Sequence, residues 1–171
     1  MQSGEEIILP GSVTAWHQTT IYARISGYLK SWYADIGSHV AAGELLAVIE
    51  APELDAQLRQ ARADLNTAMA NNKLAQSTAQ RWLNLRKSDS VSKQEADEKV
   101  SAAKALQALV TAAQANVDRL NELVGFERII APFEGVITAR NTDIGALINA
   151  GSTTDGQPLF QIAQTNPLRI S

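Results

Sequence analysis

The 171-residue chain contains no cysteine, few aromatic residues (5%) and no strong excess of either charge. Without cysteine it forms neither a disulfide nor a thiolate metal site, and it has no cysteine nucleophile. Its 15 Lys and Arg against 18 Asp and Glu give a net charge of −3, which lacks the basic footprint of a nucleic-acid-binding protein. No apolar run approaches the roughly 18 residues of a transmembrane helix, and the first residues do not resemble a signal peptide.

Glycine and proline are absent from the 72 residues between Glu53 and Val124, of which 15 are alanine. Such a composition predicts helix, with Pro52 at the first helical position and Gly125 as the C-cap. Ser92 followed by Glu95 matches a capping box, so we expect a turn at about residues 88–92. Apolar or small residues recur every three or four positions, a narrow seam that predicts an antiparallel helical hairpin over residues 52–125. The seam positions are Leu54, Leu58, Ala61, Leu65, Ala68, Ala75, Ala79 and Trp82, with Asn72 as the polar exception, and then Ala103, Leu106, Val110, Ala113, Val117, Leu120 and Val124.

The flanks of this hairpin are repeats of one another. Residues 23–43 align without gaps on residues 131–151, at an offset of 108, with seven identities in 21 positions. Each repeat predicts short strands between turns, too small to bury a core alone, so we expect two halves (20–51 and 126–164) to close into one sandwich. The glycines expected at turns are Gly27, Gly37, Gly43, Gly135, Gly145 and Gly151.

The glycine spacing of each repeat resembles half of a biotinyl/lipoyl domain. A lipoyl domain split by a long helical hairpin resembles the periplasmic adaptors (membrane fusion proteins) of tripartite efflux pumps, and the resemblance covers residues 7 to 171. It implies an α+β fold, a lipoyl-like β-sandwich with an antiparallel coiled-coil hairpin inserted between its halves. It implies that residues 1–19 and 165–171 are strands that lead from and back into the family's β-barrel domain. It also implies that the chain is a fragment, because that barrel and a membrane-proximal domain would follow.

In the resistance-nodulation-division drug-efflux branch of this family, an Arg, a Leu and a Ser at the hairpin tip engage the outer-membrane channel. Arg81, Leu85 and Ser92 match that spacing and flank the predicted turn. The resemblance therefore implies that these three residues bind the channel. Each also has an ordinary structural explanation: a solvated helix charge for Arg81, closure of the helix pair for Leu85, and a helix cap for Ser92.

The resemblance implies three partners: an outer-membrane channel, an inner-membrane transporter and further copies of the same protein, in a ring built as a trimer or hexamer. It implies a periplasmic location, with attachment to the inner membrane through an anchor outside this chain. Neither a cofactor nor a metal is expected. Adaptors of type I secretion or metal efflux remain alternatives. Secretion adaptors have much longer hairpins, and metal-efflux adaptors carry Met or His clusters where this chain has two methionines in all.

Three other classes of function compete with the adaptor. A lipoyl or biotin carrier needs a lysine at the junction of its halves, and residues 48–53 have none, while Lys30 lies elsewhere. An enzyme is disfavoured because His17 and His39 have no ligand-like spacing, and because Asp35 and Asp143 precede glycine turns that explain them. A free coiled-coil scaffold would not need the β halves. We therefore expect no catalysis.

Overall fold

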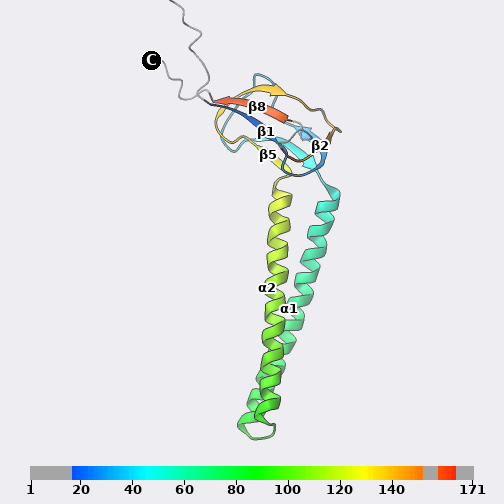
Figure 1. Cartoon of the computed structure of the whole chain (residues 1–171), viewed down its shortest axis with the longest axis vertical. Helices are drawn as coiled ribbons and strands as arrows, with labels where there is room; N and C mark the ends of the chain where they lie inside the picture. The colour runs from blue at the N-terminus through cyan, green and yellow to red at the C-terminus, as the bar shows by residue number, and fades with distance from the viewer. Residues whose placement is uncertain (1–16, 152–157, 165–171) are drawn as a thin grey trace, which may run out of the picture. The chain divides into compact units, whose positions relative to one another are not determined.

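A computed structural model describes residues 17–151 and 158–164. The chain divides into two compact units, one made of residues 1–52 with 125–171 and the other of residues 53–124. The first contains eight strands and the second a pair of helices (Figure 1). The elements are β1 (His17–Tyr22), β2 (Gly27–Trp32), β3 (His39–Val40), β4 (Leu45–Glu50), α1 (Pro52–Lys87), α2 (Lys93–Gly125), β5 (Arg128–Ile130), β6 (Gly135–Arg140), β7 (Leu147–Ile148) and β8 (Pro158–Gln164).

The strands form two four-stranded antiparallel sheets, ordered β1-β8-β6-β3 and β5-β4-β2-β7. The predicted sandwich and the α+β fold class are confirmed. The core is made of β-branched and other apolar side chains that are almost fully buried, which is the burial that makes such a small sandwich stable. Its largest buried members are Phe160, Leu29, Leu46, Ile49, Ile137, Ile148, Leu159, Ile162 and Val40.

The repeat at offset 108 appears as a pseudo-symmetry of strand pairing. Leu29 pairs with Ile49 between β2 and β4, and the equivalent Ile137 pairs with Ile162 between β6 and β8. A break in register follows at the same place in both pairs. Gly37 N–H donates to the carbonyl of Ile137 at 2.8 Å, and its counterpart Gly145 donates to the carbonyl of Leu29 at the same distance. The two halves are therefore alike in hydrogen bonding as well as in sequence.

The halves do not each form a sheet of their own. Strands β1 and β3 of the first half join the sheet that holds β6 and β8, whereas β2 and β4 join the sheet that holds β5 and β7. Consecutive strands thus alternate between the two layers within each half, whereas β4 and β5, on either side of the hairpin, lie in the same sheet. This interleaving brings Val48 opposite Arg128, and Ile49 N–H donates to the carbonyl of Glu127 at 2.7 Å. The strands that precede and follow the hairpin are therefore paired neighbours, as expected for an insertion.

Four of the six glycines assigned to turns lie in turns with a positive φ, among them Gly37 at 90° and Gly145 at 87°. The prediction is wrong for Gly27 and Gly135, which begin strands β2 and β6. Their lack of a side chain serves close packing instead. A Cβ on Gly27 would lie 2.4 Å from the carbonyl oxygen of Glu50, and one on Gly135 would lie 2.3 Å from that of Ala163.

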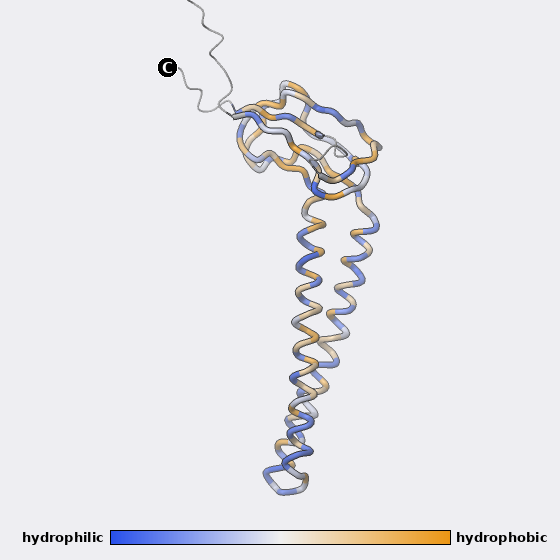
Figure 2. Tube along the Cα trace, in the orientation of Figure 1, coloured by the Kyte–Doolittle hydropathy of each residue, from blue (hydrophilic) through white to orange (hydrophobic). Residues whose placement is uncertain are grey.

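The hairpin agrees with its predicted limits. Helix α1 spans 36 residues from Pro52, α2 ends at Gly125, and the turn lies between Lys87 and Lys93. The seam positions are the less exposed ones in both helices, and Leu58, Ala61, Val117 and Leu120 form a buried cluster. Hydropathy therefore alternates along each helix (Figure 2).

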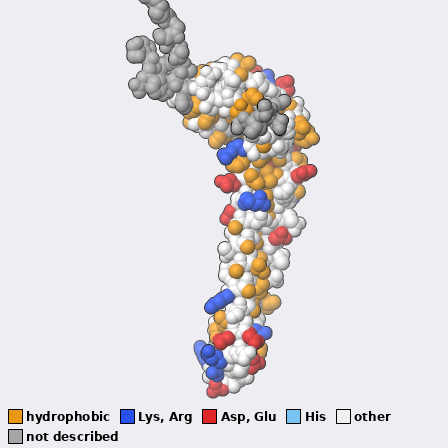
Figure 3. All heavy atoms as spheres, viewed as in Figure 1, with side chains coloured by type: hydrophobic (Ala, Val, Ile, Leu, Met, Phe, Trp, Pro, Cys, Tyr) orange, Lys and Arg blue, Asp and Glu red, His pale blue; other side chains and the backbone are white. Residues whose placement is uncertain are grey.

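The polar exception in the seam bonds across it. Asn72 Nδ2 donates to Gln107 Oε1 at 2.9 Å, and Arg62 donates to Asn121 at 3.1 Å, so the helices are held antiparallel by polar as well as apolar contacts. Figure 3 shows charged side chains of both signs gathered near the turn. Among the described residues, no helix has a segment apolar enough to cross a membrane.

The outer limits of the sandwich differ from the expected ones. The boundary expected at residue 20 is wrong, because residues 17–19 belong to β1 and pair with β8 inside the sandwich. The rest of the two expected leading strands, residues 1–16 and 165–171, lies outside the described residues.

Candidate functional site

The predicted channel-binding residues lie around the turn of the hairpin. Arg81 and Leu85 are one helical turn apart near the end of α1 and so share a face, and Ser92 immediately precedes α2. All three are exposed, Leu85 at 36%. Across residues 17–151 and 158–164, the Arg81 guanidinium has no hydrogen bond or ion pair. Its five donors are therefore available to a partner.

The capping box predicted from Ser92 and Glu95 is present. Ser92 N–H donates to Glu95 Oε1 at 3.0 Å, and Glu95 N–H donates to Ser92 Oγ at 3.1 Å. The Ser92 N–H, and after it the Ser92 hydroxyl, lowers the pKa of the Glu95 carboxyl. Two donors at the start of α2 are thereby satisfied by side chains, which is the stabilising action of a capping box.

Two other cations near the tip contact neighbouring side chains. Arg86 and Asp89 form an ion pair at 2.8 Å, and Asp89 has a φ of 57°, a left-handed conformation that Asp adopts more readily than most residues. The side chain of Lys99 lies over the ring of Trp82, 5.2 Å from its centroid. Neither contact was anticipated from the sequence, although the three-residue spacing of Arg86 and Asp89 is a recognisable signal.

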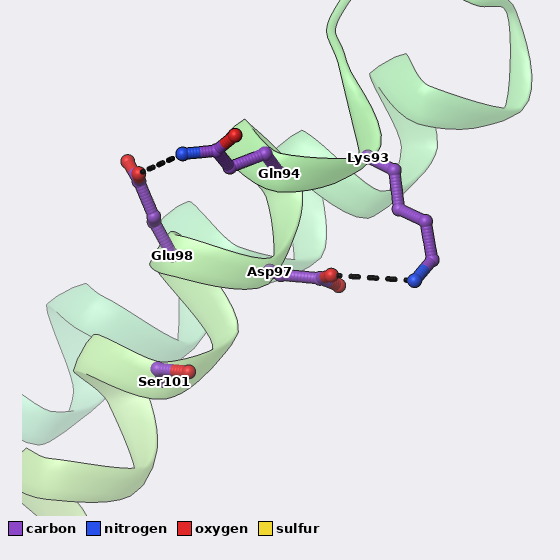
Figure 4. Close-up of a pocket in the computed structure, with 5 residues that line it drawn as sticks. All are labelled: Lys93, Gln94, Asp97, Glu98 and Ser101. Atoms are coloured by element: carbon purple, nitrogen blue, oxygen red, sulfur yellow. Dashed lines mark hydrogen bonds and ion pairs between the residues drawn. The ribbon is translucent and has the colours of Figure 1, made fainter.

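An open depression on α2, just after the turn, has no catalytic character (Figure 4). Lys93 pairs with Asp97 at 3.6 Å, and Gln94 donates to Glu98 at 3.4 Å. In Figure 4 these four side chains form two pairs, each one helical turn apart along α2. The side chains drawn there do not converge on one point as a nucleophile and its base would. These exposed pairs belong to the helix surface and contribute little to stability.

A second polar cluster lies in the sandwich, where Asp35 and Asp143 occupy equivalent positions of the repeat. Arg140 Nε lies 2.9 Å from Asp35 Oδ1, and Arg140 Nη1 lies 3.0 Å from Asp143 Oδ1. The guanidinium stacks on Trp32, 4.1 Å from the ring centroid, and bonds the carbonyl of Thr142. The hydrogen bond that Asp35 accepts from Arg140 is the main cause that lowers the pKa of the Asp35 carboxyl.

This cluster ties the two turns together. Trp32 and Arg140 are themselves 108 residues apart, so they occupy the same position in the two halves and meet face to face. The sequence pattern assigned both aspartates to turn formation and missed Arg140, although the repeat alignment places it opposite Trp32. A guanidinium that binds two carboxylates, a carbonyl and a ring has a structural role: it links the two halves of the sandwich.

The structure offers no metal ligand set in the residues that it describes. His39 lies 3.7 Å from Glu134 on the exposed edge of its sheet, with no third ligand beside it. The tip of the hairpin therefore remains the candidate functional site.

Comparisons with known proteins place this geometry in context. Residues 17–157 match the family model described as "RND MFP, barrel-sandwich hybrid domain". The chain is 29% identical over 160 residues to multidrug resistance protein MdtA of Xenorhabdus bovienii, covering 94% of this chain and 38% of that protein. It is 31% identical over 160 residues to MdtA of Yersinia pestis, with coverages of 94% and 35%. The chain thus spans little more than a third of the curated relatives that it matches.

Solved structures share the fold. MacA of Actinobacillus actinomycetemcomitans superposes with a TM-score of 0.70 at 20% identity, over 88% of this chain and 50% of that chain. A MacA–MexA chimeric protein that contains the Pseudomonas aeruginosa MexA α-hairpin domain has a TM-score of 0.63 at 23% identity, over 90% of this chain and 50% of the other. At these identities the likeness concerns architecture.

Proposed function

Because the chain belongs to the RND membrane fusion proteins through its barrel-sandwich hybrid domain, we propose that it is the sandwich and hairpin of a periplasmic adaptor. The adaptor joins an inner-membrane transporter to an outer-membrane channel in a drug-efflux pump. The name of the MdtA relatives, multidrug resistance protein, supports drugs as the cargo. The role is structural, with no catalytic step and no cofactor.

The observation that carries this proposal is the exposed and unpaired Arg81 beside the exposed Leu85 at the tip of the hairpin. Arg81 and Leu85 present one cation and one apolar side chain on a single face of α1, and Ser92 lies across the turn from them. Arg is enriched in protein contacts because its guanidinium binds carbonyl and carboxylate oxygens, and the exposed Leu85 beside it adds apolar surface that a partner can bury. We assign the channel contact to this tip.

The length of the hairpin suits a bridge. The 36 residues of α1 extend about 54 Å at the rise of an α-helix, and the seam and the Asn72–Gln107 bond hold the two helices together over that distance. A weak contact at each tip is sufficient when several adaptors act together, because ring assembly raises the effective concentration of the remaining tips.

Two open grooves lined by residues of both helices support self-association into a ring. Each groove is lined by small and larger apolar side chains together with polar ones, and side chains of unequal size form the ridges and grooves onto which a neighbouring helix packs. One is lined by Leu74, Ala75, Ala102 and Leu106, and the other by Ala79, Leu83, Val100 and Ala103, among other residues. A trimer or a hexamer would use such faces, and the remaining domains of the longer protein would contact the transporter.

The test uses the full-length protein in cells that lack the native gene. We expect Arg81→Ala and Leu85→Ala each to reduce crosslinking from the tip to the outer-membrane channel about tenfold or more, the loss typical of a contact hot spot. Dye efflux falls in parallel, while helicity and melting temperature stay unchanged. Arg59→Ala and Leu109→Ala are matched controls, because both side chains are exposed and lie away from the tip. Normal efflux in both tip variants would refute the assignment.

A further inference from the structure

The loop of the hairpin, residues 88–92, is held by its own serines. Ser88 N–H and Ser90 N–H both donate to the carbonyl of Leu85, at 3.2 and 2.9 Å, and the Ser88 hydroxyl donates to the same oxygen at 3.0 Å. A hydroxyl has a single proton. Since the proton of Ser88 is used on Leu85, Ser90 must be the donor in the 3.0 Å contact between the two serine oxygens.

Leu85 is therefore the anchor of the loop as well as the proposed apolar contact of the tip. Its carbonyl is one of the last in α1, where helical partners run out, and the loop supplies the donors that the helix lacks. The ion pair between Arg86 and Asp89 also links the end of α1 to the loop. The backbone position of Leu85 is thus determined by the loop and not by α1 alone.

The other end of the loop is determined by Ser92. Its oxygen accepts from Glu95 N–H, its N–H donates to Glu95, and its carbonyl accepts from Ala96 N–H at 3.1 Å. The Ser92 hydroxyl also helps to lower the pKa of the Glu95 carboxyl through a side-chain hydrogen bond. The polar atoms of Ser92 are therefore directed at the first turn of α2, and Glu95 is the residue that holds them there.

We propose that Ser92 and Glu95 are positioning residues of the docking tip: together they fix the start of α2 and the loop, and through the loop they hold Leu85 and its neighbour Arg81 in the docking geometry. Ser92 itself makes no contact with the channel. The inference rests on the proposed function, and it changes the role that the family resemblance assigns to Ser92. Docking gains from a preformed tip because ordering a loop upon binding would cost affinity.

The two roles of Ser92 are separable because Asp and Asn are N-caps as good as Ser but have no hydroxyl. The full-length protein is expressed in cells lacking the native gene, with a photo-crosslinking amino acid at Lys87, an exposed tip position. The yield of crosslinked outer-membrane channel, identified by mass spectrometry, is compared for Ser92→Asp, Ser92→Asn, Ser92→Ala, Glu95→Gln and Glu95→Ala. Glu98→Ala, at a neighbouring exposed carboxylate, is the matched control.

We expect the Asp, Asn and Gln variants to keep the wild-type yield, because they preserve the cap or the box. The two Ala variants lose about fivefold, and Glu98→Ala loses nothing. Circular dichroism of each purified variant is expected to give the helicity and melting temperature of the wild type within a few degrees. A loss confined to the variants without a cap is then a loss of tip geometry and not of folding.

Two results would overturn the inference while leaving the proposed function in place. If Ser92→Asp and Ser92→Asn lose as much as Ser92→Ala, the hydroxyl contacts the channel directly. If Ser92→Ala keeps the wild-type yield, the cap has no part in docking. A wild-type protein that gives no channel crosslink from Lys87, at normal expression, would instead contradict the proposed function, and this inference with it.

Discussion

At the scale of single residues, Arg140 joins several polar groups and a ring within the sandwich. Its side chain is 19% exposed, and it joins Asp35 and Asp143, at equivalent positions of the two halves, and Trp32 at the end of β2. Trp32 and Arg140 break the pseudo-symmetry that they share, because one position holds a ring and the other a cation. That difference is what permits a stacked pair where two identical residues would meet.

We predict that Arg140→Met lowers the melting temperature by roughly 4 °C at neutral pH, as expected for a partly buried charge network in a chain of this size. The pKa of Asp35 is lowered in the folded protein. Its stabilising contribution is therefore present above the unfolded value of about 3.9 and disappears as the pH falls through the lower folded value. The melting difference between wild type and variant should shrink below about pH 4.

Thermal melts followed by circular dichroism measure this difference. They cover about pH 2.5 to 7, a range that brackets the ordinary carboxyl pKa. Arg128→Met is the control, because Arg128 is an exposed strand arginine of the same sandwich. A constant difference across the pH range would mean that Arg140 acts through Trp32 and not through Asp35.

At the scale of elements, the seam that stabilises the hairpin differs in composition between its two ends. The buried cluster of Leu58, Ala61, Val117 and Leu120 lies in the half that is remote from the turn. The half nearer the turn buries alanines such as Ala79, Ala96 and Ala103. Asn72 lies between these zones and bonds Gln107. A polar residue in a coiled-coil seam lowers stability but restricts the register, and we assign that role to Asn72.

We predict that Asn72→Leu raises the melting temperature of the hairpin by several degrees, because a leucine buries apolar surface at a half-buried seam position. Melting followed at the helical signal near 222 nm, the usual wavelength for helix, tests this. The adjacent Asn71, which is exposed and outside the seam, supplies the control Asn71→Leu with little expected change. A decrease for Asn72→Leu would show that the hydrogen bond to Gln107 outweighs the apolar gain.

At the scale of the whole molecule, the sandwich contains every strand pairing found among residues 17–151 and 158–164, together with its own core. All eight strands belong to the unit formed by residues 1–52 and 125–171, and β4 pairs with β5 across the site of insertion. The helices contribute no strand to either sheet. The sandwich therefore meets the conditions for folding without the hairpin.

We predict that replacing residues 53–124 by a short Gly–Ser linker leaves a folded β-sandwich, because Val48 and Arg128 are already paired. A dispersed amide spectrum by NMR and a cooperative melt are the expected results. The matched comparison is the same deletion with Gly135→Val, where a side chain has no space beside the carbonyl of Ala163. An unfolded linker variant would show that the hairpin is needed for folding.

The sequence by itself determined the features that depend on near neighbours along the chain. The limits of the hairpin follow from the absence of glycine and proline, from Pro52 and Gly125 at its ends, and from the Ser92–Glu95 box. Helical hydrogen bonds and caps span three or four residues, so local composition is sufficient. The repeat at offset 108 also anticipated two like halves. It identified the glycines, although it misjudged Gly27 and Gly135, since their constraint comes from a strand distant in sequence.

Only the tertiary structure decided how the halves combine and which polar groups meet. A repeat shows that two segments are alike, but a free strand edge accepts any complementary edge, so it does not reveal that the halves exchange strands between two sheets. The same interleaving carries Arg140 to Asp35, 105 residues away, and Trp32 onto its guanidinium. At the tip, the sequence placed Arg81, Leu85 and Ser92 around one turn. The capping box at Ser92 was also predicted from the sequence, and only the structure showed that it forms while the Arg81 guanidinium has no partner in the described part of the chain.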